Sequence, residues 1–278
     1  MIKRFAIIYL HHQISASTTS IHQHHQLGSM TRVYLDIAVG SQSAYDAAII
    51  EHLRGIGWLI KNASTYGLPS TVDELDEVGR ETVESCFTGE FPGVKCRLDP
   101  PESLIIGRLH FDLSSSPNLV KQTENFIYLL TAQKSPGRNK KGLCYKDTPM
   151  HRFVEGFVLQ GGDVTRGDGS GGESIYGGTL PDPKPPHQPH TYGSLSYASS
   201  SSKNSSTSQF FITLTPNTPA GIAERKKKLD NKYYPFGQLV SEDEALLKKL
   251  EERLGGQVGW DGLAARGERC WVAECGVC

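Results

Sequence analysis

Short stretches of apolar residues recur along the chain and predict a mainly β protein. Residues 31–39 and 103–113 are rich in β-branched and aromatic side chains, which is typical of strands. A terminal strand is predicted over 270–274. Between residues 150 and 240, short apolar runs are separated by Gly, Pro and Ser, a spacing typical of a β-sandwich or a β-barrel.

Apolar residues at helical spacing predict a smaller number of helices. The first covers residues 42–61 in spite of two internal glycines, and a second one, rich in Asp and Glu, follows over 72–86. Two further amphipathic helices are predicted over 119–133 and 242–254.

The start of the chain has a different character. Residues 1–29 are polar and rich in His, so we expect them to be disordered. Three interpretations stay open: a short secretory signal, an organelle transit peptide, or a stretch that precedes the true start at Met30. We expect a cytoplasmic protein, or a mitochondrial or secreted one if residues 1–29 are a targeting leader.

The composition narrows the range of partners. Of 278 residues, 29 are Lys or Arg and 30 are Asp or Glu, and the net charge of −1 gives no general attraction to nucleic acid or to a membrane surface. We interpret the basic run 225–228 as a solvated loop. Cys270, Cys275 and Cys278 lack a second pair of ligands, so we predict no metal and no other cofactor.

The most specific pattern lies in three blocks of the second half of the chain. Met150–Gly178 reads MHRFVEGFVLQGGDVTRGDGSGGESIYGG, Gly193–Leu214 reads GSLSYASSSSKNSSTSQFFITL, and residues 229–237 contain LDNK followed by FG. These blocks resemble, in the same order, the signature segments of the cyclophilin-type peptidyl-prolyl cis–trans isomerases. TRVYLDIAVG, IIGRLHFDL, KQTENFIYLL and VAECG resemble strands and a helix of that family. The similarity covers about residues 31–40 and 103–278.

This resemblance implies a mainly β fold, a closed eight-stranded antiparallel barrel with a helix at each end and a hydrophobic pocket on its outer wall. It predicts one cyclophilin-like domain over residues 30–278. A helical insertion of about 41–102 would interrupt this domain between its first two strands. Such an insertion is tolerable because the entropic cost of loop closure rises slowly with loop length. Packing against the barrel and docking of a partner both stay open as its role.

The resemblance also implies peptidyl-prolyl cis–trans isomerase activity that assists protein folding. Rotation about an amide bond has a barrier of roughly 18–20 kcal/mol because resonance gives the C–N bond double-bond character. A catalyst for this rotation needs no nucleophile and no metal, since it holds the proline ring in an apolar pocket and stabilises the twisted amide. Proline-containing peptides and unfolded client proteins are the expected partners, and we expect neither nucleic acid nor a membrane.

The match with the family's motifs implies ten site residues. Arg152 stands at the position of the family's catalytic arginine, and a fixed cation there can stabilise the twisted amide electrostatically. The expected catalytic residues are Arg152, Phe157, Gln160 and Phe211, and the expected substrate-binding residues are Val158, Ala198, Ser199, Gln209, Leu229 and Tyr233.

Four positions depart from the family's pattern. Val158 replaces a usual Met, and Ser199 stands where the family usually has Asn. Lys228 occupies the position of a ligand-binding Trp, and Tyr233 that of a pocket His. We therefore expect weak binding of cyclosporin, the cyclic peptide inhibitor of the family. A second function stays open, that of a proline-binding interaction module with little turnover, which recruits partners through the groove or the insertion.

Overall fold

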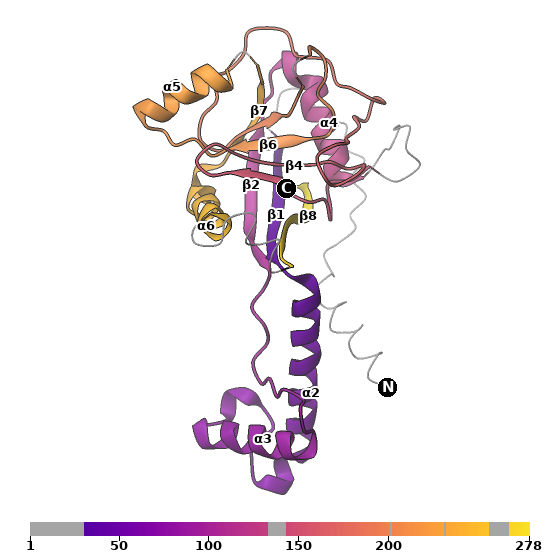
Figure 1. Ribbon diagram of the computed structural model, residues 1–278, viewed down its shortest axis with the longest axis vertical. Coiled ribbons are helices and arrows are strands. Elements are labelled where there is room, and N and C mark those ends of the chain that lie inside the picture. The colour runs from indigo at the N-terminus through magenta and orange to yellow at the C-terminus, as the bar shows by residue number, and fades with distance from the viewer. Residues whose placement is uncertain (1–30, 133–142, 201, 231, 256–266) are drawn as a thin grey trace.

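The computed structural model describes residues 31–132, 143–200, 202–230, 232–255 and 267–278 (Figure 1). The interpretations of residues 1–29 and of Met30 as a start lie outside the described residues. Within these ranges, none of the helices combines the length and the apolar character that crossing a membrane requires.

Eight strands in the described ranges form one antiparallel sheet with the order β3-β4-β6-β5-β7-β2-β1-β8. This sheet confirms the predicted mainly β fold, and the terminal strand is longer than the predicted 270–274. The strands are β1 (Thr31–Gly40), β2 (Ile105–Leu113), β3 (Arg152–Val154), β4 (Val158–Gly161), β5 (Ser194–Tyr197), β6 (Phe210–Thr213), β7 (Pro235–Leu239) and β8 (Arg269–Val277).

The predicted closed barrel needs a correction, because β3 and β8 are the two edges of the strand ladder and do not pair with each other. The segment just before β3 bridges this gap. The backbone N–H of Asp147 donates to the carbonyl of Val272 at 2.8 Å, and that of Met150 donates to the carbonyl of Cys270 at 2.9 Å. A third bond runs from Val272 N–H to the carbonyl of Thr148 at 3.0 Å. The sheet is therefore an open barrel whose edges are joined by irregular backbone.

The core lies inside this curved sheet. On β1, the alternate residues Val33, Leu35 and Ile37 are buried, as the period of two in a strand requires. Helix α4 (Val120–Thr131) places Phe126 in the centre of the core. Its ring centroid lies 5.1, 5.4 and 5.2 Å from those of Tyr145, Phe210 and Phe236, respectively.

Helix α6 (Glu244–Leu254) contributes Leu247, Leu250 and Leu254 to the same core. The buried face of the helix predicted over 242–254 is therefore confirmed. Its first two predicted residues belong to a 3₁₀ turn over Ser241–Asp243 and not to the α-helix. The prediction over 119–133 agrees with α4.

The basic run is not the solvated loop that was predicted. It forms the last turn of helix α5 (Pro219–Lys228), which begins after Thr218, whose side chain accepts a hydrogen bond from Gly221 N–H. Arg225 is buried, and its guanidinium donates to the carbonyls of Thr215 at 2.6 Å and Pro216 at 2.8 Å. This buried cation fixes α5 to the end of β6.

Residues 41–102, which we call the stalk, contain helices α2 (Gln42–Tyr66) and α3 (Glu77–Glu90). The Ser41 side chain caps α2, and Gly67 ends it in the left-handed conformation with φ 67°. Asp76 caps α3 by accepting from Gly79 N–H at 2.7 Å. Both helices run past the predicted ends at 61 and 86, and α3 starts later than the predicted 72 because a 3₁₀ turn over Val72–Glu74 precedes it.

The stalk has a hydrophobic core of its own, built around Trp58, Leu59, Val83 and Phe87 and separate from the core of the sheet. Figure 1 shows the stalk projecting away from the sheet. Its two ends meet at the sheet, where Val39 N–H donates to the carbonyl of Leu104 at 2.9 Å. Because the two cores are separate, we expect the sheet to keep its own packing when the stalk is removed.

We expect that replacement of residues 42–101 by a two-residue Asn-Gly turn leaves the melting temperature of the sheet within about 5 °C of that of the full chain. Differential scanning calorimetry on both proteins measures it. As a control, Phe126→Ala opens a cavity in the central core and should cost about 3–5 kcal/mol of unfolding free energy. A loss of similar size in the shortened chain would show that the stalk supports the sheet.

Candidate active site

A second apolar cluster lies on the outer face of the sheet. Leu159 and Phe210 belong to the central core, whereas their neighbours Val158 and Phe211 belong to a separate cluster with Leu229. Successive side chains of a strand point to opposite faces, so the residues next to the core line the outer wall. Val154, Phe157, Ala198 and Tyr233 are partly buried against this cluster. The structure thus brings together six of the predicted site residues, Phe157, Val158, Ala198, Phe211, Leu229 and Tyr233.

Phe211 is the centre of this outer cluster. Its ring meets that of Tyr233 edge-on with centroids 5.2 Å apart, and it stacks on the ring of His190 at 6.0 Å. His190 is buried, and its Nδ1 lies 2.8 Å from a carboxylate oxygen of Asp230. Burial lowers the pKa of His190, although the bond to Asp230 opposes this. His190, fixed by Asp230, therefore supports Phe211 on one side of the cluster.

A row of polar side chains borders the cluster. Arg152 on β3 faces Gln160 on β4, and its guanidinium lies 3.4 Å from the side-chain oxygen of Gln160. The amide of Gln160 donates to the side-chain oxygen of Gln209 at 2.9 Å. Since Val158 and Gln160 are two residues apart on β4, the polar row and the apolar cluster share one face. Arg152 is exposed, so its guanidinium is accessible to a ligand on this face.

Gln209 is held by the loop 163–172. Its amide donates to the carbonyls of Gly169 at 2.9 Å and Gly171 at 2.6 Å. The loop is organised around Asp163, whose carboxylate accepts bonds from the N–H groups of Thr165, Arg166, Gly169 and Gly171 at 3.1, 2.9, 3.0 and 2.9 Å. A continuous series of hydrogen bonds therefore leads from Asp163 to Arg152.

The last turn of α5 forms another side of the cluster. Lys228 extends over the ring of Phe157, with its ammonium nitrogen 5.1 Å from the ring centroid. The same nitrogen pairs with the Glu224 carboxylate at 2.6 Å. The position that the resemblance assigned to a ligand-binding Trp therefore carries a cation beside the cluster.

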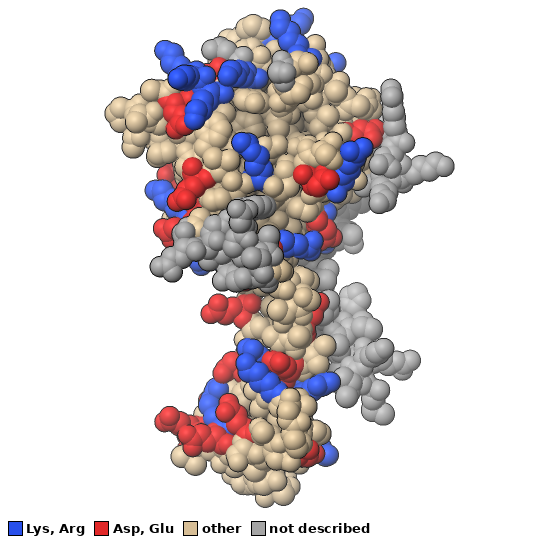
Figure 2. Space-filling model, viewed as in Figure 1, with Lys and Arg blue, Asp and Glu red and all other residues tan. Residues whose placement is uncertain are grey.

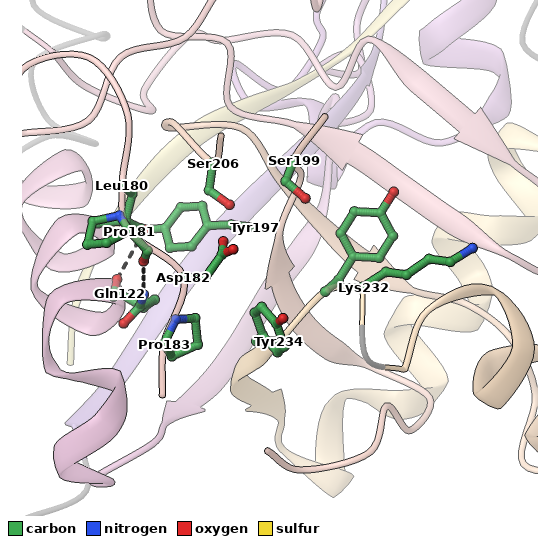
Figure 3. Close-up of a pocket in the computed structure, with 11 residues that line it drawn as sticks. Gln122, Leu180, Pro181, Asp182, Pro183, Tyr197, Ser199, Ser206, Lys232 and Tyr234 are labelled. Atoms are coloured by element: carbon green, nitrogen blue, oxygen red, sulfur yellow. Dashed lines mark hydrogen bonds between the residues drawn. The ribbon is translucent and has the colours of Figure 1, made fainter. Parts of the chain in front are cut away.

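Ser199 does not belong to the outer cluster. It lines a hollow together with Tyr197, Pro181 and Tyr234 (Figure 3). Tyr233 also lines this hollow and belongs to the outer cluster as well. Gln122 from α4 borders the hollow and donates to the carbonyl of Pro181 at 2.7 Å. Tyr233 thus lies between the hollow, which it lines, and the outer cluster, against which it packs. The functional roles of all ten predicted residues stay predictions.

Sequence reasoning missed the residues that support the site from behind. Asp163 stands between Gly162 and the Gly-rich loop. An Asp directly before a turn is a detectable signal, because its carboxylate can accept hydrogen bonds from the backbone N–H groups of that turn. Asp230 belongs to the LDNK motif, and the resemblance assigns it no role. The buried position of His190 has no signal in the sequence, because its partner Asp230 is 40 residues away.

A model of the family described as cyclophilin type peptidyl-prolyl cis-trans isomerase/CLD matches residues 103–265. A Rhizopus delemar protein named peptidyl-prolyl cis-trans isomerase cyp11 is 42% identical over 137 residues, which are 49% of this chain and 37% of that protein. An Arabidopsis thaliana protein named peptidyl-prolyl cis-trans isomerase CYP21-1 is 45% identical over 93 residues, 34% of this chain and 41% of that protein. The chain thus spans less than half the length of these relatives.

We expect Asp163→Asn to destabilise the protein by about 1–3 kcal/mol at pH 6, because several buried donors lose a charged acceptor. Burial opposes ionisation of Asp163, but the bonds from Arg166, Gly171 and Thr165 outweigh it and lower its pKa to about 2. For a depressed pKa, the stabilisation is complete above the ordinary Asp pKa of about 3.9 and disappears as the pH falls to the folded-state value. The difference between the wild type and the variant should therefore shrink between pH 4 and pH 2.

Urea unfolding of both proteins at several pH values measures this difference. Asp168→Asn is the matched control, because Asp168 lies in the same loop, is exposed and accepts bonds from Ser170. We expect its loss to stay below about 0.5 kcal/mol. A difference for Asp163→Asn that does not change with pH would contradict the role of its carboxylate.

Proposed function

We propose that this chain, which belongs to the cyclophilin-type peptidyl-prolyl cis–trans isomerase family, accelerates rotation about X–Pro bonds in peptides and in folding proteins. The observation that carries the proposal is one shared surface. An apolar cluster that suits a proline ring lies beside an exposed, permanently charged Arg152. The relatives named peptidyl-prolyl cis-trans isomerase support the same activity.

In the proposed mechanism, the proline ring rests against Phe211, Leu229 and Phe157. The apolar contacts hold the ring, while the acyl side of the X–Pro bond stays free to turn. When the amide twists, resonance is lost and the nitrogen regains a lone pair that can accept a hydrogen bond. The guanidinium of Arg152 donates to this lone pair. Because this interaction exists only in the twisted state, it lowers the barrier instead of only tightening substrate binding.

Gln160 and Gln209 have supporting roles in this proposal. Gln160 accepts from Arg152 and donates to Gln209, so the guanidinium is held in one orientation without a carboxylate partner at this side. A carboxylate would reduce the positive potential at the reacting nitrogen, whereas a neutral amide leaves it largely intact. The same amides can also bond to the substrate backbone.

We expect Arg152→Ala to reduce kcat/KM for a short Ala-Pro peptide by about 100-fold or more, the usual loss when an electrostatic donor to the transition state is removed. Arg152→Lys keeps the charge without the planar fork and should lose less. Exchange spectroscopy of the cis and trans resonances measures the rates. Arg80→Ala is the control, since Arg80 lies in the stalk and pairs with Asp99.

Full activity of a folded Arg152→Ala variant would sink the proposed mechanism. No turnover by the folded wild-type chain would favour the proline-binding module instead. An equal loss in the Arg80 variant would point to a global defect and not to the site.

We also expect weak binding of cyclosporin. An ammonium group is strongly hydrated, so Lys228 beside Phe157 offers poor contact to an apolar cyclic peptide. Lys228→Trp should tighten the dissociation constant by about tenfold, which corresponds to about 1.4 kcal/mol. Isothermal titration calorimetry measures it, with Lys227→Trp as the control on the same helical turn. Tight binding by the wild type would refute this expectation.

A further inference from the structure

Lys228 places a charged group beside the apolar cluster on the side of α5. Its ammonium nitrogen is 5.1 Å from the centroid of the Phe157 ring, within the range of a cation–π contact. Slightly more than half of its side chain, 53%, is exposed. A ligand seated against Phe157 therefore meets this ammonium group at the edge of its binding surface.

We infer that Lys228 is a specificity residue that favours peptides with an acidic side chain one or two residues from the proline. This inference rests on the proposed function. It concerns which X–Pro peptides are preferred and not how the bond rotates.

The spacing between Lys228 and Arg152 agrees with a contact to a side chain one or two residues from the proline. Arg152 and Gln160 form one register pair of the β3–β4 hairpin, and Val154 and Val158 form the pair next to the turn. Phe157 lies in that turn, so its backbone is displaced from that of Arg152 by roughly 7–10 Å at about 3.3 Å per residue, and Lys228 lies at the far side of its ring. An extended peptide covers such a distance with two to three residues. If the X–Pro bond lies at Arg152, a neighbouring side chain of the peptide reaches Lys228.

Lys228 keeps donors for a second carboxylate. An ammonium group has three N–H donors, and Glu224 is the acidic partner of this group. Asp230, two residues further on, is engaged with His190 instead. Residues 224–232 contain five basic and two acidic side chains, so the local charge is positive even with the Lys228–Glu224 pair formed.

The neighbouring cations extend this positive region. Lys226 and Lys227 are exposed on the same helical turn, and Lys232 lines the hollow beyond Tyr233. Figure 2 shows Lys and Arg side chains gathered over α5, next to acidic ones. Basic residues at the end of a helix also stabilise it by their interaction with the helix dipole. That structural role is insensitive to the charge of a substrate, which allows a clean test.

The experiment uses acetylated and amidated Ala-Pro peptides. In each peptide, one residue within two positions of the proline, before or after it, is Glu, Gln or Lys. Acetylation and amidation remove the charges of the two ends, so the peptides differ in charge only at the tested side chain. For the wild-type chain, kcat/KM should be about threefold higher for Glu than for Gln and about threefold lower for Lys than for Gln at one of these positions. The ratios should approach one at 0.5 M salt because exposed charges are screened.

Lys228→Glu should reverse this order and change the Glu-to-Lys ratio by at least tenfold. Lys227→Glu is the matched control, with the same change of charge on an exposed residue of the same turn that is not placed over Phe157. It should keep the order of the three peptides. Glu224→Gln removes the internal competitor for Lys228 and should increase the preference for Glu peptides.

Three results would overturn the inference. One is an equal rate for Glu and Gln peptides with the wild type at every position. Another is a Lys228→Glu variant that changes all three peptides by the same factor, as a purely structural role would. The last is an equal reversal by Lys227→Glu, which would assign the effect to the general field of α5.

Failure of the proposed function has a different signature. If the wild type turns over none of the peptides, the isomerase proposal fails, and the preference is then measured as the ratio of dissociation constants by titration calorimetry. A Glu preference in binding that Lys228→Glu reverses would still support the inference, and equal dissociation constants would overturn it.

Discussion

The functional surface depends on the alternation of side chains across β4 and β6. Leu159 and Phe210 point into the central core, so Val158 and Phe211 must point outward. A shift of either strand by one residue would exchange its inward and outward side chains and destroy the core and the outer cluster together. The aromatic contacts of Phe210 with Phe126 and Tyr145 oppose such a shift. The packing of the core therefore determines the position of the outer cluster.

The polar side of the site depends on hydrogen bonds that start in a loop. Asp163 is 1% exposed and gathers the loop backbone around its carboxylate, and the loop carbonyls then hold Gln209. The series starts at the buried Asp163, passes through the partly buried Gln209 and Gln160, and ends at the exposed Arg152. Such an arrangement reduces the rotational freedom that a long Arg side chain would otherwise lose on binding a substrate. A preorganised cation of this kind suits electrostatic stabilisation of a transition state.

Strands and buried helix faces were predictable because their apolar periodicity records burial, as for Val33, Leu35 and Ile37 on β1. The residues of the outer cluster came from the family resemblance, and their convergence on one face needed the structure. Helix α5 was missed because its stability comes from a buried Arg225 that binds carbonyls ten and nine residues earlier, a tertiary contact with no local pattern. The open edge between β3 and β8 was also missed, since the bridging bonds involve irregular backbone around Pro149.

The stalk and the outer cluster are separate in their packing. The β1–β2 ladder runs from Thr31 opposite Leu113 to Ala38 opposite Ile105, so the register is set by the strands although 64 residues connect their ends. The stalk contains 11 acidic and five basic residues, yet Figure 1 places it at the end of the molecule opposite α5. Dissolved salt screens these charges from the outer cluster, because the Debye length is about 8 Å at physiological ionic strength. The charge beside Phe157 therefore comes from the last turn of α5, where the ammonium group of Lys228 lies over the ring.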